Sequence, residues 1–236
     1  MLFRWTEQSI RWFVDASAYT GFHGEVAKKI LPHLKPGESL CDVGCGLGRL
    51  DLELAPHLSR VLSMDINPDV IDVLNRDAQT RGITNLQGVC GDATTLTEEF
   101  DILLMSFFEK AGTMDDYLRL CRRLLIRIVN AENKGSLYPS SHRKVQKNVV
   151  ADVQRELEER GQPYHLELIS AEFGQPLRSR QDADQFVLSH ASEASGKELE
   201  DFLSENLTET RRKDFPLFLP HRKEAGIFFI FKKDET

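Results

Sequence analysis

The sequence LCDVGCGLG at residues 40–48 places three glycines on alternate positions directly after an apolar run. If a helix follows, the free N–H groups and the dipole at its start can bind a polar or anionic ligand. A tight turn that binds nothing would have the same composition, because glycine is also the default residue where a chain turns sharply. This stretch alone therefore predicts either a ligand-binding loop or a structural turn.

The spacing of the glycines disfavours two common ligands. The dinucleotide fingerprint G-x-G-x-x-G needs its third glycine at position 49, where the chain has Arg49, and the third glycine is instead Gly48. The Gly-Lys-Ser/Thr of the P-loop is also missing. NAD and ATP in their usual binding modes are therefore not expected. Arg49 is expected to be a solvated residue of the first helical turn, with a contact to the carboxylate of a bound cofactor as its alternative.

Two further acidic residues stand at the ends of the next apolar runs. Asp65 ends RVLSMD, and Asp92 follows LQGVC. Because the carboxyl ends of parallel strands meet at one edge of a sheet, both carboxylates are expected beside the glycine loop. Asp65 could instead cap a helix, but Asn67 already suits that role, and Asp92 could be an ordinary polar loop residue.

The segments LCDVGCGLGRL, SMDINP, GDA and FDILLMSFF resemble, in this order, the motifs of class I S-adenosylmethionine-dependent methyltransferases. The resemblance covers roughly residues 37–110. It implies an α/β Rossmann-like fold with a seven-stranded, mostly parallel sheet, helices on both faces and a last strand inserted antiparallel. It also implies S-adenosylmethionine (SAM) as the cofactor, S-adenosylhomocysteine (SAH) as its product and methyl transfer as the reaction.

The resemblance also implies roles for individual residues. Asp65 would bind both ribose hydroxyls, and Ile66 would lie against the adenine face. The carboxylate of Asp92 and the N–H of Ala93 would recognise the adenine edge, while Asp42 would help to hold the ammonium group. The glycines would let the backbone approach the methionine portion of the cofactor. The predicted cofactor residues are Asp42, Gly44, Cys45, Gly46, Gly48, Asp65, Ile66, Asp92, Ala93 and Ser106.

The acceptor side is less defined by sequence. Methyl transfer is an in-line displacement that needs alignment and exclusion of water, and no covalent enzyme intermediate. In the family the acceptor lies beyond the fourth strand, where Phe107 and Phe108 could wall a pocket or simply be buried aromatics. The Asn/Asp-Pro-Pro-Tyr/Phe of amine-methylating enzymes and the Pro-Cys of cytosine-C5 enzymes are both missing there.

A general base would help if the acceptor is a hydroxyl or an acidic carbon. Two histidines, His23 and His142, lie in segments that commonly cover this site in the family, and Tyr19 and Tyr138 accompany them. Each of the four is a candidate catalytic residue, with a surface or structural role as its alternative.

Alternation of apolar runs with segments of helical period predicts the elements that must position these residues. Expected strands cover residues 39–43, 60–65, 86–90, 100–108, 124–129, 164–174 and 225–231. Expected helices include 68–82, 114–124, one ending near Gly161, 182–188 and 196–207. We expect a single domain over residues 1–236, with helical decoration at 1–23, a cofactor-binding core at 24–132 and the acceptor-side elements at 133–236.

Composition limits the partners and the location. The formal net charge is −7 over 236 residues, so a small-molecule acceptor is expected in preference to RNA, and no membrane association is expected. A basic cluster of Arg143, Lys144 and Lys147, with Lys134 nearby, leaves RNA methylation open, and a SAM-binding protein without activity is a further alternative. No signal peptide is seen, and the four cysteines lack metal-site spacing, so a cytoplasmic protein without a metal is expected. The oligomeric state is not predicted.

Overall fold

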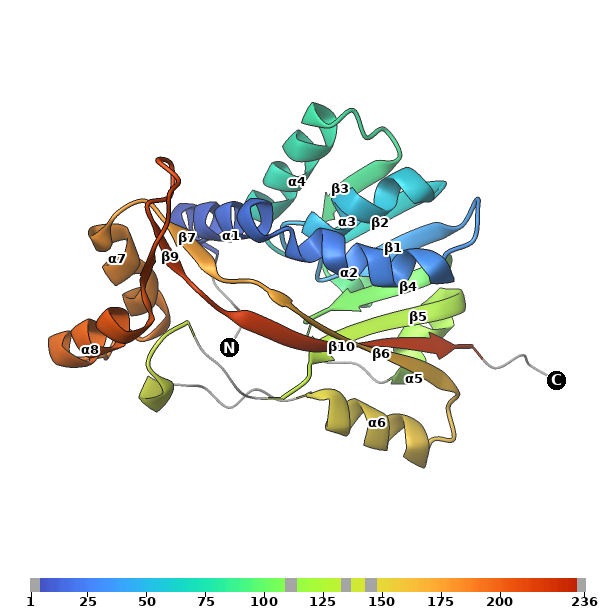
Figure 1. Ribbon diagram of the computed structural model, residues 1–236. Coiled ribbons are helices and arrows are strands. Elements are labelled where there is room, and N and C mark those ends of the chain that lie inside the picture. Colours follow the sequence, from blue (N-terminus) through green and yellow to red (C-terminus); the bar gives the residue numbers. More distant parts are fainter. Residues whose placement is uncertain (1–4, 109–113, 133–136, 143–147, 233–236) are drawn as a thin grey trace.

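The computed structural model describes residues 5–108, 114–132, 137–142 and 148–232. Its centre is a seven-stranded sheet in the order β3-β2-β1-β4-β5-β10-β6 (Figure 1). These strands are β1 (Ser39–Val43), β2 (Arg60–Asp65), β3 (Leu86–Cys90), β4 (Phe100–Ser106), β5 (Cys121–Asn130), β6 (Tyr164–Glu172) and β10 (Arg222–Phe231).

The strand directions confirm the predicted sheet. The neighbours from β3 to β5 are all parallel, whereas β10 pairs antiparallel with both β5 and β6. The last strand is therefore inserted between two strands of the opposite direction. The sheet, with helices on both faces, has the α/β Rossmann-like architecture expected from the sequence.

Helices cover both faces of the sheet (Figure 1). On one face lie α2 (Phe22–Ile30), α3 (Arg49–Leu54) and α4 (Pro68–Thr80), and on the other lie α5 (Met114–Leu120) and α6 (Val150–Glu159). Single 3₁₀ turns join several elements: η1 (Leu31–His33), η2 (Ala55–His57), η3 (Ala93–Thr95) and η4 (Ser140–His142). Strands buried on both faces read as continuous apolar runs, which explains the composition of β4 and β5.

Helix α4 forms where its end signals predict. The Asn67 side chain accepts a hydrogen bond from the Asp69 N–H at 2.8 Å, and Pro68 occupies the first helical position. Its buried residues recur at helical spacing, and the left-handed Gly82 follows its end. The chain between β2 and β3 is thereby fixed at both ends, which positions Asp65 at the start of the loop into α4.

A second group of elements lies beyond the carboxyl ends of the parallel strands (Figure 1). It comprises α1 (Glu7–Thr20), α7 (Arg180–His190), α8 (Gly196–Asn206) and a small sheet of β7 (Gln175–Leu177), β8 (Thr208–Glu209) and β9 (Leu217–Leu219). Trp12 of α1 packs with Phe186 of α7, and its indole N–H donates to Asp182 at 2.9 Å. The small sheet was not predicted, and α1 is packed against distant parts of the chain.

Two predicted boundaries are wrong. Helix α5 ends at Leu120 and not at Leu124, because the chain enters β5 at Cys121, which pairs with Phe100. Strand β4 ends at Ser106 and not at Phe108, since Phe107 adopts a left-handed φ of 51° that no strand continues. The other predicted strands and helices are confirmed to within a few residues.

Three expectations are not decided by the fold. The division of the chain into domains and the cytoplasmic location stay predictions. The basic cluster of Lys134, Arg143, Lys144 and Lys147 lies outside the described residues. Among the described residues, every helix is too short or too polar to cross a bilayer.

A glycine substitution tests the packing beneath the glycine loop. A Cβ at Gly48 would lie 2.5 Å from Leu74 Cδ1 of α4, at a φ of 57°. We expect Gly48→Ala to lower the free energy of unfolding by about 2 to 4 kcal/mol, as backbone strain and overpacking combine. The matched control is Gly82→Ala, which has a φ of 69° but nothing within 4 Å of its Cβ and should cost only about 1 kcal/mol. Equal losses in urea unfolding of the two variants would contradict the packing role.

Candidate active site

The glycine loop is bonded to the end of β2. The N–H groups of Gly44 and Cys45 both donate to the Met64 carbonyl, at 2.8 and 3.0 Å, and the Gly46 N–H donates to Asp65 Oδ2 at 2.9 Å. These bonds hold the loop against the neighbouring strand end. The loop and Asp65 therefore lie together, as the sequence predicts.

The three glycines meet different neighbours. All three have positive φ, between 53° and 74°. A Cβ at Gly44 would lie 2.1 Å from the Phe108 ring, and one at Gly46 would lie 3.4 Å from Trp5. Gly48 faces the buried Leu74. Packing against Phe108 and Leu74 thus already accounts for Gly44 and Gly48, whereas Gly46 has only an ordinary contact with Trp5.

Asp65 ends β2, and Ile66 follows it directly in the chain. The second carboxylate oxygen of Asp65, Oδ1, accepts the Asn67 N–H at 2.9 Å, so each oxygen accepts one backbone bond. A carboxylate oxygen has two lone pairs, which leaves each oxygen able to accept another hydrogen bond. Ile66 is 53% exposed, which is unusual for a large apolar side chain beside a core strand. The pair offers a hydrogen-bonding group next to an open apolar surface.

Asp92 begins the turn after β3. Its Oδ1 accepts the Thr94 N–H at 2.8 Å and so caps the 3₁₀ turn that contains Ala93. The Gly91 N–H donates to the Asp65 carbonyl at 2.9 Å, which fixes this turn next to Asp65. The cap uses one carboxylate oxygen of Asp92. Asp92 itself lies after the end of β3, at the edge of the sheet, as predicted.

A buried carboxyl pair lies beneath the loop and was missed from the sequence. Asp42 of β1 and Asp51 of α3 are 2% and 0% exposed, and each carboxyl lies close enough to influence the pKa of the other. Ser63 Oγ, on the neighbouring strand, donates to Asp51 Oδ2 at 2.6 Å. Only the placement of Asp51 between Leu50 and Leu52 in a short apolar helix signals this in the sequence.

Burial sets the protonation of this pair. Desolvation raises the pKa of Asp42 well above its usual value, and the charge of Asp51 adds to the effect. Desolvation likewise raises the pKa of Asp51 to about 6, although the Ser63 hydrogen bond opposes this. The Asp42 carboxyl is thus engaged inside the fold, and its predicted contact with a ligand ammonium group stays a prediction.

Arg49 is not solvated, contrary to expectation. Its side chain is 7% exposed and forms an ion pair with Asp77 of α4. Arg49 is the first residue of α3, and its ion pair with Asp77 therefore connects α3 with α4. Arg49, which stands where the dinucleotide fingerprint has its third glycine, is therefore held by its ion pair with Asp77.

The four candidate bases lie in different surroundings. His23 packs among Phe13, Phe22 and Phe173, and burial, with Lys223 and Arg49 nearby, lowers its pKa to about 3. At neutral pH its imidazole is uncharged and only weakly basic, a poor match for general base catalysis. Its Nδ1 lies 2.8 Å from Ser17 Oγ.

The other three candidates contact the elements beyond the sheet. Tyr19 stacks on Phe218 of β9 with ring centroids 5.0 Å apart, and Tyr138 stacks on His190 of α7 at 5.5 Å. His142 Nε2 lies 3.6 Å from the carboxylate of Glu198 in α8. Structural contacts therefore account for all four residues, and their catalytic roles stay predictions.

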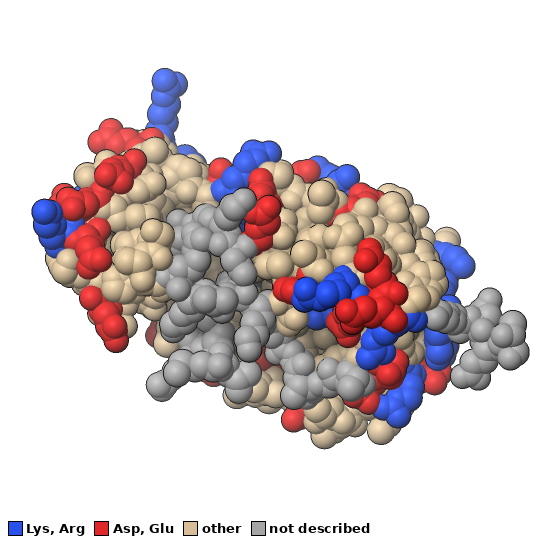
Figure 2. All heavy atoms as spheres, turned by 90° about the horizontal axis from the view of Figure 1, so that it is seen from below, with Lys and Arg blue, Asp and Glu red and all other residues tan. Residues whose placement is uncertain are grey.

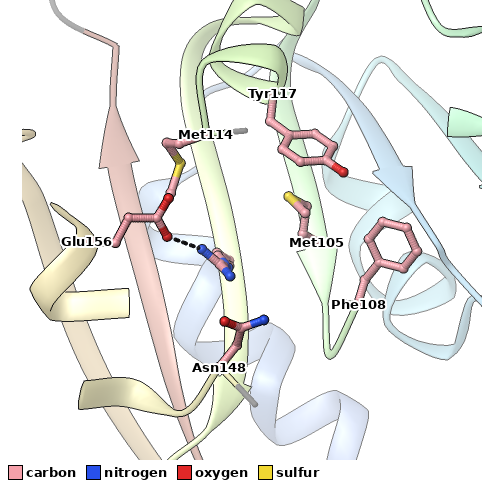
Figure 3. A pocket seen from close by; sticks show the side chains of 7 residues that line it. Met105, Phe108, Met114, Tyr117, Asn148 and Glu156 are labelled. Carbon is pink, nitrogen blue, oxygen red and sulfur yellow. Dashed lines mark hydrogen bonds and ion pairs between the residues drawn. The ribbon is translucent and has the colours of Figure 1, made fainter. Parts of the chain in front are cut away.

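A cavity of about 170 Å³ lies between the face of β4 and β5 and the helices α5 and α6 (Figure 3). Arg127 of β5 forms an ion pair with Glu156 of α6 at 3.1 Å within it, and its buried Nε has no hydrogen-bond partner among the described residues. The residues around it are Met105, Phe108, Met114, Tyr117, Arg127, Asn148 and Glu156. Phe108 borders both this cavity and Gly44, so the cavity adjoins the glycine loop.

Phe107 and Phe108 point to opposite faces of the sheet. Phe107 packs with the α2 side, where its ring centroid lies 3.6 Å from Lys223 Nζ. Burial lowers the pKa of this lysine to about 8, and the aromatic ring stabilises the charged form. Of the two aromatics, Phe108 is the one that reaches the cavity.

Comparison with known families identifies the class of the central region. Residues 40–127, from β1 into β5, match the family model described as a methyltransferase domain. Together with the strand order, this match identifies that region as a class I methyltransferase domain, the class expected from the motifs.

Individual relatives have several acceptors. A probable cobalt-precorrin-6B C(15)-methyltransferase (decarboxylating) of Methanothermobacter thermautotrophicus is 28% identical over 123 residues, covering 47% of this chain and 63% of that protein. The tRNA (uracil-5-)-methyltransferase homolog A of Mus musculus is 28% identical over 135 residues, 56% of this chain and 22% of the relative. Both matches span less than two thirds of the relative.

Solved structures share the fold over most of the chain. Magnesium protoporphyrin IX methyltransferase from Synechocystis PCC 6803, determined with bound SAH, superposes with a TM-score of 0.55 at 15% identity. The superposition covers 92% of this chain and 84% of that one. At this identity the likeness shows the common fold.

The Asp42–Asp51 pair predicts a pH dependence of stability. The folded pKa of Asp51, about 6, exceeds its unfolded value of about 3.9, so the folded state retains a proton that the unfolded state releases. Its stabilising effect is complete below about pH 4 and is lost as the pH rises through 6. The Asp51→Asn variant has no carboxyl at this position and so does not lose stability in this way as the pH rises. The free energy of unfolding of the variant minus that of the wild type should therefore rise by about 2 kcal/mol between pH 4 and 7.

Urea unfolding at a series of pH values measures this difference. The control is Asp72→Asn, an exposed residue of α4, whose difference from wild type should stay flat over the same range. Parallel curves for wild type and Asp51→Asn would show that burial does not raise the pKa of Asp51 in the folded chain.

Proposed function

We propose that this chain is a SAM-dependent methyltransferase that acts on a small-molecule acceptor. The observation that carries the proposal is the bonded arrangement of the glycine loop with Asp65 at adjoining strand ends. A class I methyltransferase domain over residues 40–127 supports it. The magnesium protoporphyrin IX methyltransferase of the same fold was determined with bound SAH, which supports the choice of cofactor.

The residues at the strand ends suit the parts of SAM. Asp65 would accept hydrogen bonds from the ribose hydroxyls through its remaining lone pairs, because charged acceptors form the stronger hydrogen bonds. The exposed Ile66 would cover the adenine face, with Asp92 and Ala93 at its edge. Gly44, Cys45 and Gly46 would pass the methionine portion, near the end of β4 at Ser106. The proposed roles of Asp42 and Gly48 are indirect, since both side-chain positions face the protein interior.

The cavity beside Phe108 is the proposed acceptor site. Phe108 borders Gly44 on one side and the cavity on the other, so its ring stands where donor and acceptor would meet. Met105, Met114 and Phe108 supply apolar walls, and the Arg127–Glu156 pair supplies polar contacts. The exposed lining of the cavity is more polar than apolar, and fixed polar groups that orient a ligand are typical of small-molecule sites. The chain would align the acceptor and exclude water, while SAM supplies the methyl group.

RNA methylation is the second candidate function. It is favoured by the tRNA (uracil-5-)-methyltransferase homolog among the relatives. Against it, the formal net charge is −7, and acidic and basic side chains are interspersed on the face shown in Figure 2. Because RNA binding depends on positive charge gathered over the phosphate backbone, a small-molecule acceptor is the better fit.

Substitution of Asp65 tests the cofactor site. At about 100 times its dissociation constant, SAH should stabilise the wild type by about 2.7 kcal/mol, or roughly 5 to 10 °C in Tm, whereas NAD should give no shift. Asp65→Ala should lose most of this shift, because both ribose hydroxyls lose their acceptor. Asp65→Asn, which keeps one oxygen, should retain part of it.

Asp72→Ala serves as the control, since it removes an exposed carboxylate from the neighbouring helix α4. Thermal unfolding without ligand checks that each variant is folded. An undiminished SAH shift in Asp65→Ala refutes the ribose assignment, and stabilisation by NAD alone refutes the choice of cofactor.

Methyl transfer from labelled SAM to a fractionated cell extract tests the acceptor class. We expect label in the low-molecular-mass fraction, since the site is a small cavity, and none in purified RNA at low salt. Label in RNA would establish the second candidate function. SAH binding with no transfer to any fraction would contradict the enzymatic proposal and indicate a cofactor-binding protein.

A further inference from the structure

Two histidines and a glutamate gather where helix α2 meets the edge strand β6, outside the candidate active site. His33 Nε2 of η1 lies 3.1 Å from Glu167 Oε1, and His165 Nε2 lies 3.8 Å from the same oxygen. One ligand atom from each of the three residues lies within 4.8 Å of the others. Since His165 and Glu167 are two residues apart on one strand, their side chains share a face.

The spacing of these atoms is close to that of a zinc site. Zinc bonds to imidazole nitrogen and carboxylate oxygen are near 2.0–2.1 Å, so neighbouring ligand atoms in a tetrahedral site are about 3.4 Å apart. The two distances found, 3.1 and 3.8 Å, lie on either side of this value. Small side-chain rotations would therefore complete a site with three protein ligands and one open position.

The surrounding residues hold the ligands in place. The His33 ring stacks on Phe229 of β10 with centroids 3.7 Å apart. Lys29 Nζ of α2 lies 3.1 Å from Glu167 Oε2, so it fixes the carboxylate through the oxygen that His33 does not contact. The contacts with His33 and Lys29 thus orient both oxygens of the Glu167 carboxylate. Hydrogen-bonded ligands of this kind are typical of metal sites.

We propose that His33, His165 and Glu167 form a zinc site that ties η1 to the edge strand β6. The positive charge of Lys29 opposes a cation, but this lysine is 46% exposed, so water screens the repulsion. Edge strands are held by one neighbour only, and β6 pairs only with β10 among the described strands. A metal bridge from β6 to the segment after α2 would fasten this edge across the face of the sheet.

Titration of the metal-free full-length chain with ZnCl2 and with CoCl2 tests the site without any cofactor. We expect one equivalent of zinc per chain, a higher Tm with zinc, and the visible absorption bands of tetrahedral Co²⁺. His165→Ala and Glu167→Gln should each weaken zinc binding at least tenfold and abolish the Tm shift. His165 is 53% exposed at its side chain, so His165→Ala is expected to fold.

His57→Ala is the control, because this exposed histidine of η2 lies outside the cluster and its loss should leave binding unchanged. Absence of zinc binding by the wild type overturns the proposal. Zinc binding that survives in both His165→Ala and Glu167→Gln also overturns the proposal. If the Cys90→Ser variant loses zinc binding, the metal is bound at this exposed thiol instead.

Discussion

The hydrogen bond from the Gly46 N–H to Asp65 holds together the two strand ends on which the candidate site is built. The Met64 carbonyl receives two further N–H groups of the glycine loop, and the Asp65 carbonyl receives the Gly91 N–H after β3. Residues 64 and 65 thus connect the ends of three neighbouring parallel strands. The loop follows this path with positive φ at each of its three glycines, a conformation that other residues rarely adopt. The glycines, the path of the loop and the position of Asp65 therefore depend on one another.

This constraint explains what was predictable from the sequence. The alternate glycines, Asp65 and Asp92 all follow apolar runs of strand length, and parallel strands bring such residues to one edge of the sheet. Local signals also placed the ends of α4, because Asn67, Pro68 and Gly82 act through their own backbone neighbourhood. The antiparallel last strand was implied by the family resemblance and was not readable from periodicity.

Long-range partners were not predictable. Asp42 and Asp51 are buried near each other only because α3 folds back over β1, and Trp12 meets Asp182 across most of the chain. The cavity beside Phe108 combines side chains from β4, β5, α5, α6 and the adjoining loops, which lie far apart in the sequence. His23 was singled out for its residue type, whereas its burial among aromatic rings decides its basicity. Residue type and spacing therefore predict which groups meet at the strand ends, and they do not predict which side chains gather around the cavity.

The central claim is that SAM binds where the ends of β1, β2 and β3 meet. Titration of the isotopically labelled chain with SAH, followed by amide NMR, tests it most directly because it reports position as well as affinity. The account predicts that the amides of Gly44, Gly46, Ile66 and Ala93 shift together with one dissociation constant, while those of His165 and Glu167 stay unchanged. Saturable shifts confined to other parts of the chain, or no shifts at millimolar SAH, would contradict it.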